Sequence, residues 1–174
     1  MTKPTLYITM GLPASGKTYF SQRFATDEGI FFLNCDNLRL AMIEHPTFKP
    51  AEHSLVYKTV RFIAEQHLRQ GQSIVCNANY HRRDRREMME KLARETGAKY
   101  QIIWVKAPYE LVKERIQSRD HEIPIEKMVD SPLKLLQNMQ AAFQAPDSTE
   151  PVIIIDGTKP YTEQRKQYDI AIAS

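Results

Sequence analysis

Two glycines, a lysine and a threonine hold fixed places in the stretch GLPASGKT, residues 11–18. The stretch matches the pattern G-x-x-x-x-G-K-[ST] in full, with Gly11, Gly16, Lys17 and Thr18 at its specified positions. A glycine-bearing loop can wrap backbone N–H groups around phosphate oxygens, and a helix that starts near Gly16 adds the positive end of its dipole. The stretch therefore predicts a phosphate-binding loop.

The polar side chains of this loop indicate a nucleoside triphosphate. We expect Lys17 to reach the β and γ phosphates and the Thr18 hydroxyl to be a ligand to Mg²⁺. The alternative is a structural turn with an exposed lysine, which the apolar run before the loop and the helix-like stretch after it disfavour. The expected cofactors are ATP, with GTP as the alternative, and Mg²⁺. The expected ATP contacts are Gly11, Leu12, Pro13, Ala14, Ser15, Gly16, Lys17 and Thr18, with Arg115 from a later helix.

A carboxylate and an arginine follow the second apolar run, in the segment FFLNCDNLR. Asp36 comes at the end of a predicted strand, on the rim of the sheet where the phosphate-binding loop lies. A carboxylate there could accept the proton of an attacking hydroxyl, and Arg39, one helical turn further on, could hold an anionic part of the acceptor. Asp36 could also be simply the N-cap of the helix NLRLAMIEH, and the two roles can coexist.

The segment YELVKERIQSRDHEIPIEKM places Arg115 and Arg119 on one helix face, ahead of a loop that contains proline. We expect residues from about 119 to 132 to fold over a bound nucleotide as a lid. An arginine that arrives with this lid would neutralise charge on the phosphoryl group in transfer, and Arg119, nearer the loop, is the expected residue. The alternative is a solvated helix face.

Four arginines crowd the segment HRRDRR, residues 81–86, at the start of a further predicted helix. Such a cluster could follow a nucleic-acid backbone. Clustered arginines are more often a solvated helix face, although cations at the amino end of a helix oppose its dipole. The segment leaves both interpretations open.

Five short apolar runs alternate with stretches of helical pattern and must position these side chains. Each run is nearly continuously hydrophobic, which predicts strands that are covered on both faces. Strand–helix–strand units imply right-handed crossovers, so we expect an α/β fold with a five-stranded parallel sheet, helices on both faces and a small helical lid. The predicted strands are residues 5–10, 30–35, 73–77, 100–107 and 152–156.

Composition limits the class of protein. The 174 residues, 42% hydrophobic and 26% charged, suit a single domain over residues 1–174. The net charge of +3 is too small to indicate a nucleic-acid partner by itself. Cys35 and Cys76 lie in apolar runs as small hydrophobes, which fits a reducing compartment. No run approaches the roughly 20 apolar residues of a membrane span, so we expect a cytoplasmic protein with no membrane partner. The oligomeric state is not indicated.

The order and spacing of four segments resemble the AAA-type P-loop kinases related to the bacteriophage polynucleotide 5′-kinase domain, over about residues 4–140. The resemblance implies a P-loop NTPase fold of the kinase type. It also implies that Asp36 is the general base toward a 5′-hydroxyl, that Arg39 grips the phosphate of the acceptor, and that Arg119 contacts the phosphoryl group in transfer. The segments are GLPASGKT, CDNLR, SIVCNANYHRRDRRE and YELVKERIQSRDHEIPIEKM.

The end of the third predicted strand departs from this family pattern. The family usually has an acidic residue there, whereas this chain has Asn77, followed by Ala78 and Asn79. An amide can hydrogen-bond an acceptor or a metal-bound water but supplies no charge. We expect Asn77 and Asn79 to contact the acceptor, and the effect of the missing charge stays open.

The expected function is ATP-dependent transfer of the γ-phosphate to a hydroxyl, with the 5′-OH of a DNA or RNA end as the first candidate acceptor. A kinase of a sugar, nucleoside or antibiotic is one alternative, and a nucleotide-binding switch without an acceptor is another. The sequence has neither the N-K-x-D segment of a GTPase nor a D-E pair at the end of an apolar strand, as in motor ATPases. The expected catalytic residues are Lys17, Asp36 and Arg119.

Overall fold

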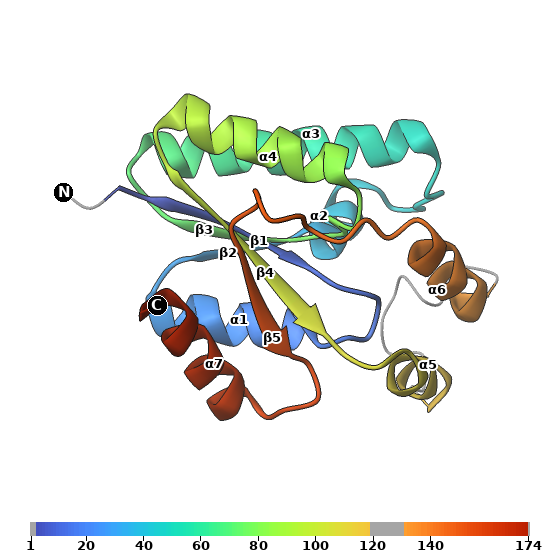
Figure 1. Ribbon diagram of the computed structural model, residues 1–174. Coiled ribbons are helices and arrows are strands. Elements are labelled where there is room, and N and C mark those ends of the chain that lie inside the picture. The colour runs from blue at the N-terminus through green and yellow to red at the C-terminus, as the bar shows by residue number, and fades with distance from the viewer. Residues whose placement is uncertain (1–2, 119–130, 174) are drawn as a thin grey trace.

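A five-stranded parallel sheet forms the centre of the computed structural model, which describes residues 3–118 and 131–173 (Figure 1). The strand order is β2-β3-β1-β4-β5, and all four neighbouring pairs are parallel. The predicted α/β fold and parallel sheet are therefore confirmed. The strands are β1 (Thr5–Met10), β2 (Phe31–Asn34), β3 (Ile74–Asn77), β4 (Lys99–Lys106) and β5 (Val152–Asp156).

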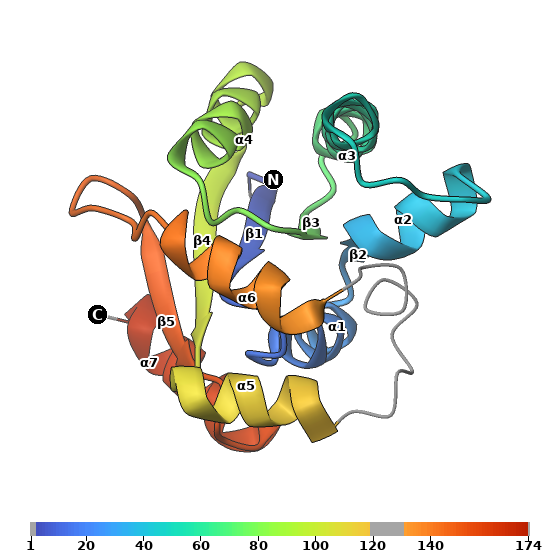
Figure 2. The same ribbon diagram turned by 90° about the vertical axis from the view of Figure 1, so that its right-hand side faces the viewer.

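Helices cover both faces of the sheet and its carboxyl edge. In Figure 1, α3 and α4 lie on one face and α1 and α7 on the other. Figure 2 looks onto the carboxyl ends of the strands, where α5 and α6 lie in front of the sheet. The helices are α1 (Lys17–Glu28), α2 (Cys35–Met42), α3 (Pro50–Arg69), α4 (Arg83–Thr96), α5 (Tyr109–Ser118), α6 (Pro132–Ala141) and α7 (Tyr161–Ala173).

The strand side chains alternate between two hydrophobic cores. Leu6, Ile8 and Ile102 are fully buried with the side chains of α3 and α4. Ile103 and Val105 instead pack with aromatic side chains of α1 and α7. Because both faces of the sheet are covered, the strands need apolar residues at nearly every position, which explains the continuous runs in the sequence.

β2 is shorter than the predicted strand 30–35 because α2 begins early. The side chain of Asn34 accepts hydrogen bonds from the backbone N–H groups of Asp36 (2.8 Å) and Asn37 (3.2 Å). Asn34 is therefore the N-cap, and Cys35 is already helical. The interpretation of Asp36 as the N-cap is wrong, and the carboxylate of Asp36 lies in the first turn of the helix.

Three other expectations concern the lid, the cysteines and the absence of a membrane span. Arg119 and the predicted lid as far as residue 130 lie outside the described residues. Both cysteines are buried and free, as the sequence indicated. Within residues 3–118 and 131–173, none of the helices has the length and apolar character needed to cross a membrane.

Candidate active site

The loop between β1 and α1 is curled by three residues with positive φ. These are Gly11 at 148°, Ala14 at 57° and Gly16 at 100°. A β-carbon on Gly11 would lie 2.3 Å from the carbonyl oxygen of Val105, so no larger residue fits without a shift of the backbone. Curled backbone of this kind, at the start of a helix, aims N–H groups at a common point and makes an anion-binding concavity.

The side chain of Lys17 folds back over this loop. Its Nζ donates hydrogen bonds to the carbonyl oxygens of Gly11 (2.9 Å) and Leu12 (2.7 Å). The ammonium therefore lies beside the N–H groups that would meet a phosphate, and it would add a charge-assisted hydrogen bond to that phosphate. This position against the loop is compatible with the predicted contact of Lys17 with the β and γ phosphates, which stays a prediction.

Arg115 of α5 joins the phosphate-binding loop to the turn after β5. Its Nη1 donates to the carbonyl oxygen of Ala14 (3.1 Å), and its Nη2 donates to that of Gly157 (3.2 Å). The predicted ATP contact of Arg115 is compatible with this position against the loop, and it stays a prediction.

Gly157 sits so close to the loop that a side chain there should disturb nucleotide binding. A β-carbon on Gly157 would lie 2.0 Å from the carbonyl oxygen of Ser15 and 2.9 Å from that of Lys106. We expect Gly157→Ala to lower the free energy of unfolding by about 1–3 kcal/mol and to weaken ATP binding, because the loop must move. Thermal unfolding and calorimetric titration with ATP measure the two effects.

Gly29→Ala is the matched control for this substitution. Gly29 ends α1 with φ at +63°, and no atom lies within 4 Å of an added β-carbon. The control should lose about 1–2 kcal/mol of stability from backbone strain but keep its ATP affinity. Equal ATP affinity in Gly157→Ala and in the unaltered protein would contradict the close packing of Gly157 on the loop.

The Asp36 carboxylate lies on the same rim of the sheet as Lys17. The Asp36 residue is exposed to solvent, but the surrounding protein still partly desolvates its carboxylate and raises the pKa above its ordinary value, while the positive charges of Lys17 and then Arg39 oppose the rise. Asp36 and Lys17 are therefore close enough for their charges to interact. A carboxylate of raised pKa beside a phosphate-binding ammonium is suited to take a proton from a hydroxyl.

Asn77, at the carboxyl end of β3, links the centre of the sheet to the phosphate-binding loop. The side chain is buried, and its Oδ1 accepts a hydrogen bond from Thr9 Oγ1 (2.8 Å). Its Nδ2 donates to Thr18 Oγ1 (3.0 Å). The amide fixes the Thr18 hydroxyl and leaves oxygen lone-pair capacity for a cation. This arrangement fits Mg²⁺, which takes few protein ligands and completes its shell with phosphate and water.

Asn79 follows β3 at the carboxyl edge of the sheet, and its backbone is held by two side chains. Its carbonyl oxygen accepts hydrogen bonds from Tyr57 Oη (2.9 Å) and from Arg85 Nη1 (3.4 Å). The guanidinium of Arg85 lies over the ring of Tyr57, at 4.2 Å from its centroid. The predicted acceptor contact of the Asn79 side chain stays a prediction.

Arg39 is buried, and the structure does not present it to an acceptor. The residue is 3% exposed, and its guanidinium forms an ion pair with Glu52. Its Nη2 lies 3.0 Å from Nδ1 of His53, and its carbon Cζ lies 4.8 Å from the ring centroid of Phe48. Because Glu52 already neutralises the charge of Arg39, this geometry argues against the predicted phosphate contact and favours a role in holding α2 against α3.

The carboxylate of Glu52 accepts several hydrogen bonds from the segment that connects α2 to α3. Its Oε2 accepts hydrogen bonds from the backbone N–H groups of Thr47 (2.5 Å) and Phe48 (3.1 Å), and from the Thr47 hydroxyl (2.9 Å). Burial would raise the pKa of Glu52, but the hydrogen bonds from Thr47 and Arg39 outweigh burial and hold the pKa at about 2. The sequence analysis missed Glu52, which stands in an ordinary amphipathic helix and has no local signal.

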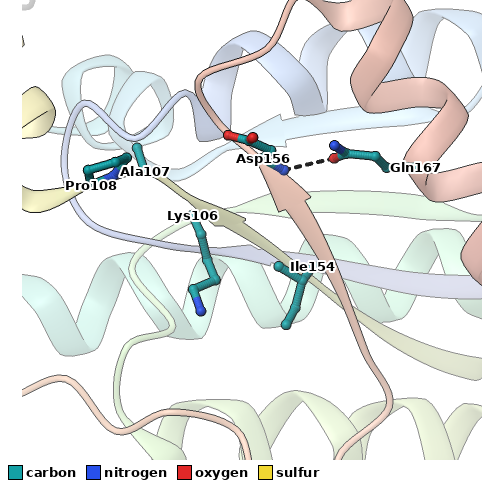
Figure 3. Close-up of a pocket in the computed structure, with 6 residues that line it drawn as sticks. All are labelled: Lys106, Ala107, Pro108, Ile154, Asp156 and Gln167. Carbon is teal, nitrogen blue, oxygen red and sulfur yellow. Dashed lines mark hydrogen bonds between the residues drawn. The ribbon is translucent and has the colours of Figure 1, made fainter.

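Two cavities open near the carboxyl end of β4. The first, of about 450 Å³, contains no residue of the phosphate-binding loop. Figure 3 shows Lys106 and Ile154 on the same side of the sheet, and the backbone N–H of Asp156 donates to Gln167 Oε1 (2.8 Å). The second cavity, of about 370 Å³, borders the loop at Leu12. Its other lining residues are Trp104, Val105, Lys106, Ala107, Tyr109, Gln140 and Phe143.

Comparison with known proteins agrees with this geometry. The model of the AAA domain family matches residues 6–146. L-seryl-tRNA(Sec) kinase of Methanococcus maripaludis is 28% identical over 163 residues, which cover 88% of this chain. The chain spans 60% of the length of that relative.

Solved structures of kinases share the fold. A putative kinase from Chloroflexus aurantiacus superposes with a TM-score of 0.77 at 22% identity, over 98% of this chain and 96% of the other. The APS kinase of Mycobacterium tuberculosis, in complex with AMPPNP and APS, gives a TM-score of 0.70 at 16% identity, over 100% of each chain. These likenesses confirm the predicted fold of the P-loop kinase type.

Proposed function

The chain belongs to the AAA domain family, and on that premise we propose that it is an ATP- and Mg²⁺-dependent kinase of a hydroxyl carried by a nucleic acid. The first candidate acceptor is the 5′-hydroxyl of a DNA or RNA end. The observation that carries the proposal is the placement of Asp36 and Lys17 on one rim of the sheet, within reach of each other's charge. A proton acceptor in this position would lie beside the γ-phosphate of a bound nucleotide, which supports the proposal.

Each group of the site has a defined task in this reaction. The backbone N–H groups of the loop, with Lys17, bind the β and γ phosphates. Thr18 would hold Mg²⁺, which would neutralise phosphate charge when bound. The acceptor oxygen forms a bond to the γ phosphorus while the bond from that phosphorus to the β–γ bridging oxygen breaks. Asp36 takes the hydroxyl proton, and the products are ADP and a phosphate ester.

A second candidate acceptor is a seryl group attached to a transfer RNA. The 28% identity with an L-seryl-tRNA(Sec) kinase over 163 residues favours it. In both candidates the molecule that bears the reactive hydroxyl contains a nucleic acid, and the chemistry at Asp36 would be the same. The two candidates differ in whether the hydroxyl is on a sugar or on an amino acid.

The test is to incubate the protein with γ-labelled ATP, Mg²⁺ and one acceptor at a time. The acceptors are 5′-hydroxyl oligonucleotides of DNA and RNA, seryl-tRNA, nucleosides and simple sugars. Label on an oligonucleotide supports the first candidate, and label on seryl-tRNA supports the second. Label on sugars or nucleosides alone would replace both with a small-molecule kinase, and ATP hydrolysis without label on any acceptor would favour a switch.

Asn77→Ala should raise the concentration of Mg²⁺ that the reaction requires. The substitution removes the amide that holds the Thr18 hydroxyl, so the hydroxyl can rotate away from the ion. We expect the Mg²⁺ concentration for half-maximal transfer to rise several-fold, consistent with the loss of a hydrogen bond worth about 1 kcal/mol. Transfer rates measured across a Mg²⁺ series show the shift. Asn138→Ala, at an exposed position in α6, is the control and should leave the Mg²⁺ requirement unchanged.

A further inference from the structure

The cavity of about 370 Å³ lies at the carboxyl end of β4, where α5 and α6 lie in front of the sheet (Figure 2). It borders the phosphate-binding loop at Leu12 alone, whose carbonyl oxygen accepts a hydrogen bond from Lys17 Nζ (2.7 Å). Asp36 follows β2, which is three strands away from β4 in the sheet, a distance of roughly 14 Å. The cavity is therefore separate from the group that would take the proton of the acceptor.

Three aromatic residues line this cavity, and they come from β4, α5 and the segment after α6. They are Trp104, Tyr109 and Phe143, and each is half-buried. Trp104 and Phe143 pack against the core under α3 and α4, with their ring centroids 5.5 Å apart and their planes 30° apart. Tyr109 packs with Leu12 against the separate cluster of α5 and α6. The cavity is thus a seam between two hydrophobic clusters, and its rings keep surface for contact with a flat ligand.

Two exposed polar residues, Lys106 and Gln140, complete the lining. Lys106 lines both cavities at this end of β4, and its Nζ lies 4.5 Å from the ring centroid of Trp104. Within residues 3–118 and 131–173, no carboxylate oxygen lies within 4.0 Å of this Nζ. The one carboxylate that lines either cavity, that of Asp156, accepts hydrogen bonds from the backbone N–H (2.9 Å) and the hydroxyl (2.7 Å) of Thr158. The ammonium of Lys106 therefore has no counter-charge in the described part of the chain.

This lining matches a planar ring that carries an anionic group. Aromatic walls favour a flat ring, the amide of Gln140 can both donate and accept hydrogen bonds at the edge of that ring, and the ammonium of Lys106 favours an anion. An aliphatic ligand would leave the amide and the ammonium without partners, and a cationic ligand would be repelled by Lys106. Small-molecule sites have volumes of about 300–1,000 Å³, so this cavity, at the lower end, suits a single ring system.

We propose that this cavity is a second nucleotide site, which binds a nucleobase between its aromatic walls and the adjoining phosphate at Lys106. The ligand is either a mononucleotide or one nucleotide of a single strand, because both present the same base and phosphate. The inference goes beyond the proposed function, since the site takes no part in phosphoryl transfer and its test does not measure transfer.

The test uses the fluorescence of Trp104, which is the only tryptophan of the chain. The protein is titrated with UMP while saturating AMPPNP and Mg²⁺ occupy the phosphate-binding loop. UMP should quench the fluorescence in a saturable manner, uridine should bind about tenfold more weakly because it lacks the phosphate, and ribose 5-phosphate should cause no quenching. An oligouridylate distinguishes the two sources of the ligand: tighter binding than UMP identifies a strand, and equal or weaker binding identifies a mononucleotide.

Two variants separate the contact with the phosphate from the contact with the base. Lys106→Ala should lower the affinity for UMP about tenfold and leave the affinity for uridine unchanged. Phe143→Leu keeps an apolar side chain against the core but removes the ring, and it should lower both affinities about fivefold or more. The matched controls are Lys58→Ala and Phe62→Leu, at exposed positions of α3, and both should keep the affinity for UMP. Thermal unfolding checks that each variant is folded.

Three results would overturn the inference. The first is the absence of quenching by both UMP and the oligouridylate. The second is an affinity for UMP that Lys106→Ala leaves unchanged. The third is quenching by UMP that occurs without AMPPNP and disappears in its presence, because UMP would then bind at the phosphate-binding loop.

Discussion

Asp36→Asn is expected to lower phosphoryl transfer by about 10²- to 10⁴-fold while ATP still binds. The amide has nearly the same shape as the carboxylate but cannot take the proton of the acceptor hydroxyl. Asp36 lies in the first turn of α2, which Asn34 caps, so the substitution removes no helix cap. The loss should therefore fall on the rate of transfer rather than on stability or nucleotide binding.

The measurement is label transfer from ATP under single-turnover conditions, with ATP affinity determined separately by calorimetry. Asp169→Asn is the control, because this exposed aspartate of α7 pairs only with Arg165 among the described residues. A second readout is the pH dependence of the rate. Since partial desolvation raises the pKa of the exposed Asp36 carboxylate, transfer should fall, as the pH is lowered, at a higher pH than an ordinary aspartate would give. Retained transfer in Asp36→Asn would remove Asp36 as the base.

Glu150→Ala is expected to cost about 3–5 kcal/mol of the free energy of unfolding, because it leaves the guanidinium of Arg86 buried without its counter-charge. Arg86 is 1% exposed and the Glu150 side chain 8%, and their two hydrogen bonds are 2.6 and 3.0 Å long. Arg86 also donates to the carbonyl oxygens of Tyr80 (3.1 Å) and Gln144 (2.9 Å). The pair thus fastens the segment before β5 to the start of α4.

Denaturant unfolding of the variants measures this loss. Glu95→Ala is the matched control, because Glu95 is 40% exposed and its pairing with Arg61 is worth at most about 1 kcal/mol. The loss of unfolding free energy in Glu150→Gln should lie between the losses in Glu150→Ala and Glu95→Ala, since glutamine keeps hydrogen-bonding atoms but not the charge. Equal losses in Glu150→Ala and Glu95→Ala would contradict the structural role of the buried pair.

The sheet and the phosphate-binding loop could be predicted because their signals are local. A strand covered on both faces needs an unbroken apolar run, and such runs are visible without knowledge of the partners. The loop likewise depends on Gly11 and Gly16, whose positive φ values glycine adopts readily, within eight residues of sequence. Asn34 shows the limit of this approach, since either Asn34 or Asp36 could cap a helix, and the backbone decides between them.

The contacts of the arginines near the proposed acceptor site could not be predicted, because they join residues that are far apart in the sequence. Arg39 looks available in the segment CDNLR, and only the packing of α2 on α3 brings Glu52 against it. The arginines of HRRDRR look alike in the sequence, but the partner of Arg86 is Glu150, on a segment far along the chain. Among the described residues, Arg85 has no carboxylate partner of the kind that its neighbours have, and a sequence pattern does not show this.

Calorimetric titration of the purified protein with ATP in the presence of Mg²⁺ tests most directly whether the loop at residues 11–18 holds a nucleoside triphosphate. We predict that each chain binds one nucleotide and that Lys17→Ala weakens binding by about tenfold or more, through loss of a charge-assisted hydrogen bond. Asp36→Asn should keep the affinity of the unaltered protein. Absence of binding of both ATP and GTP by the unaltered protein would contradict the proposed function at its base.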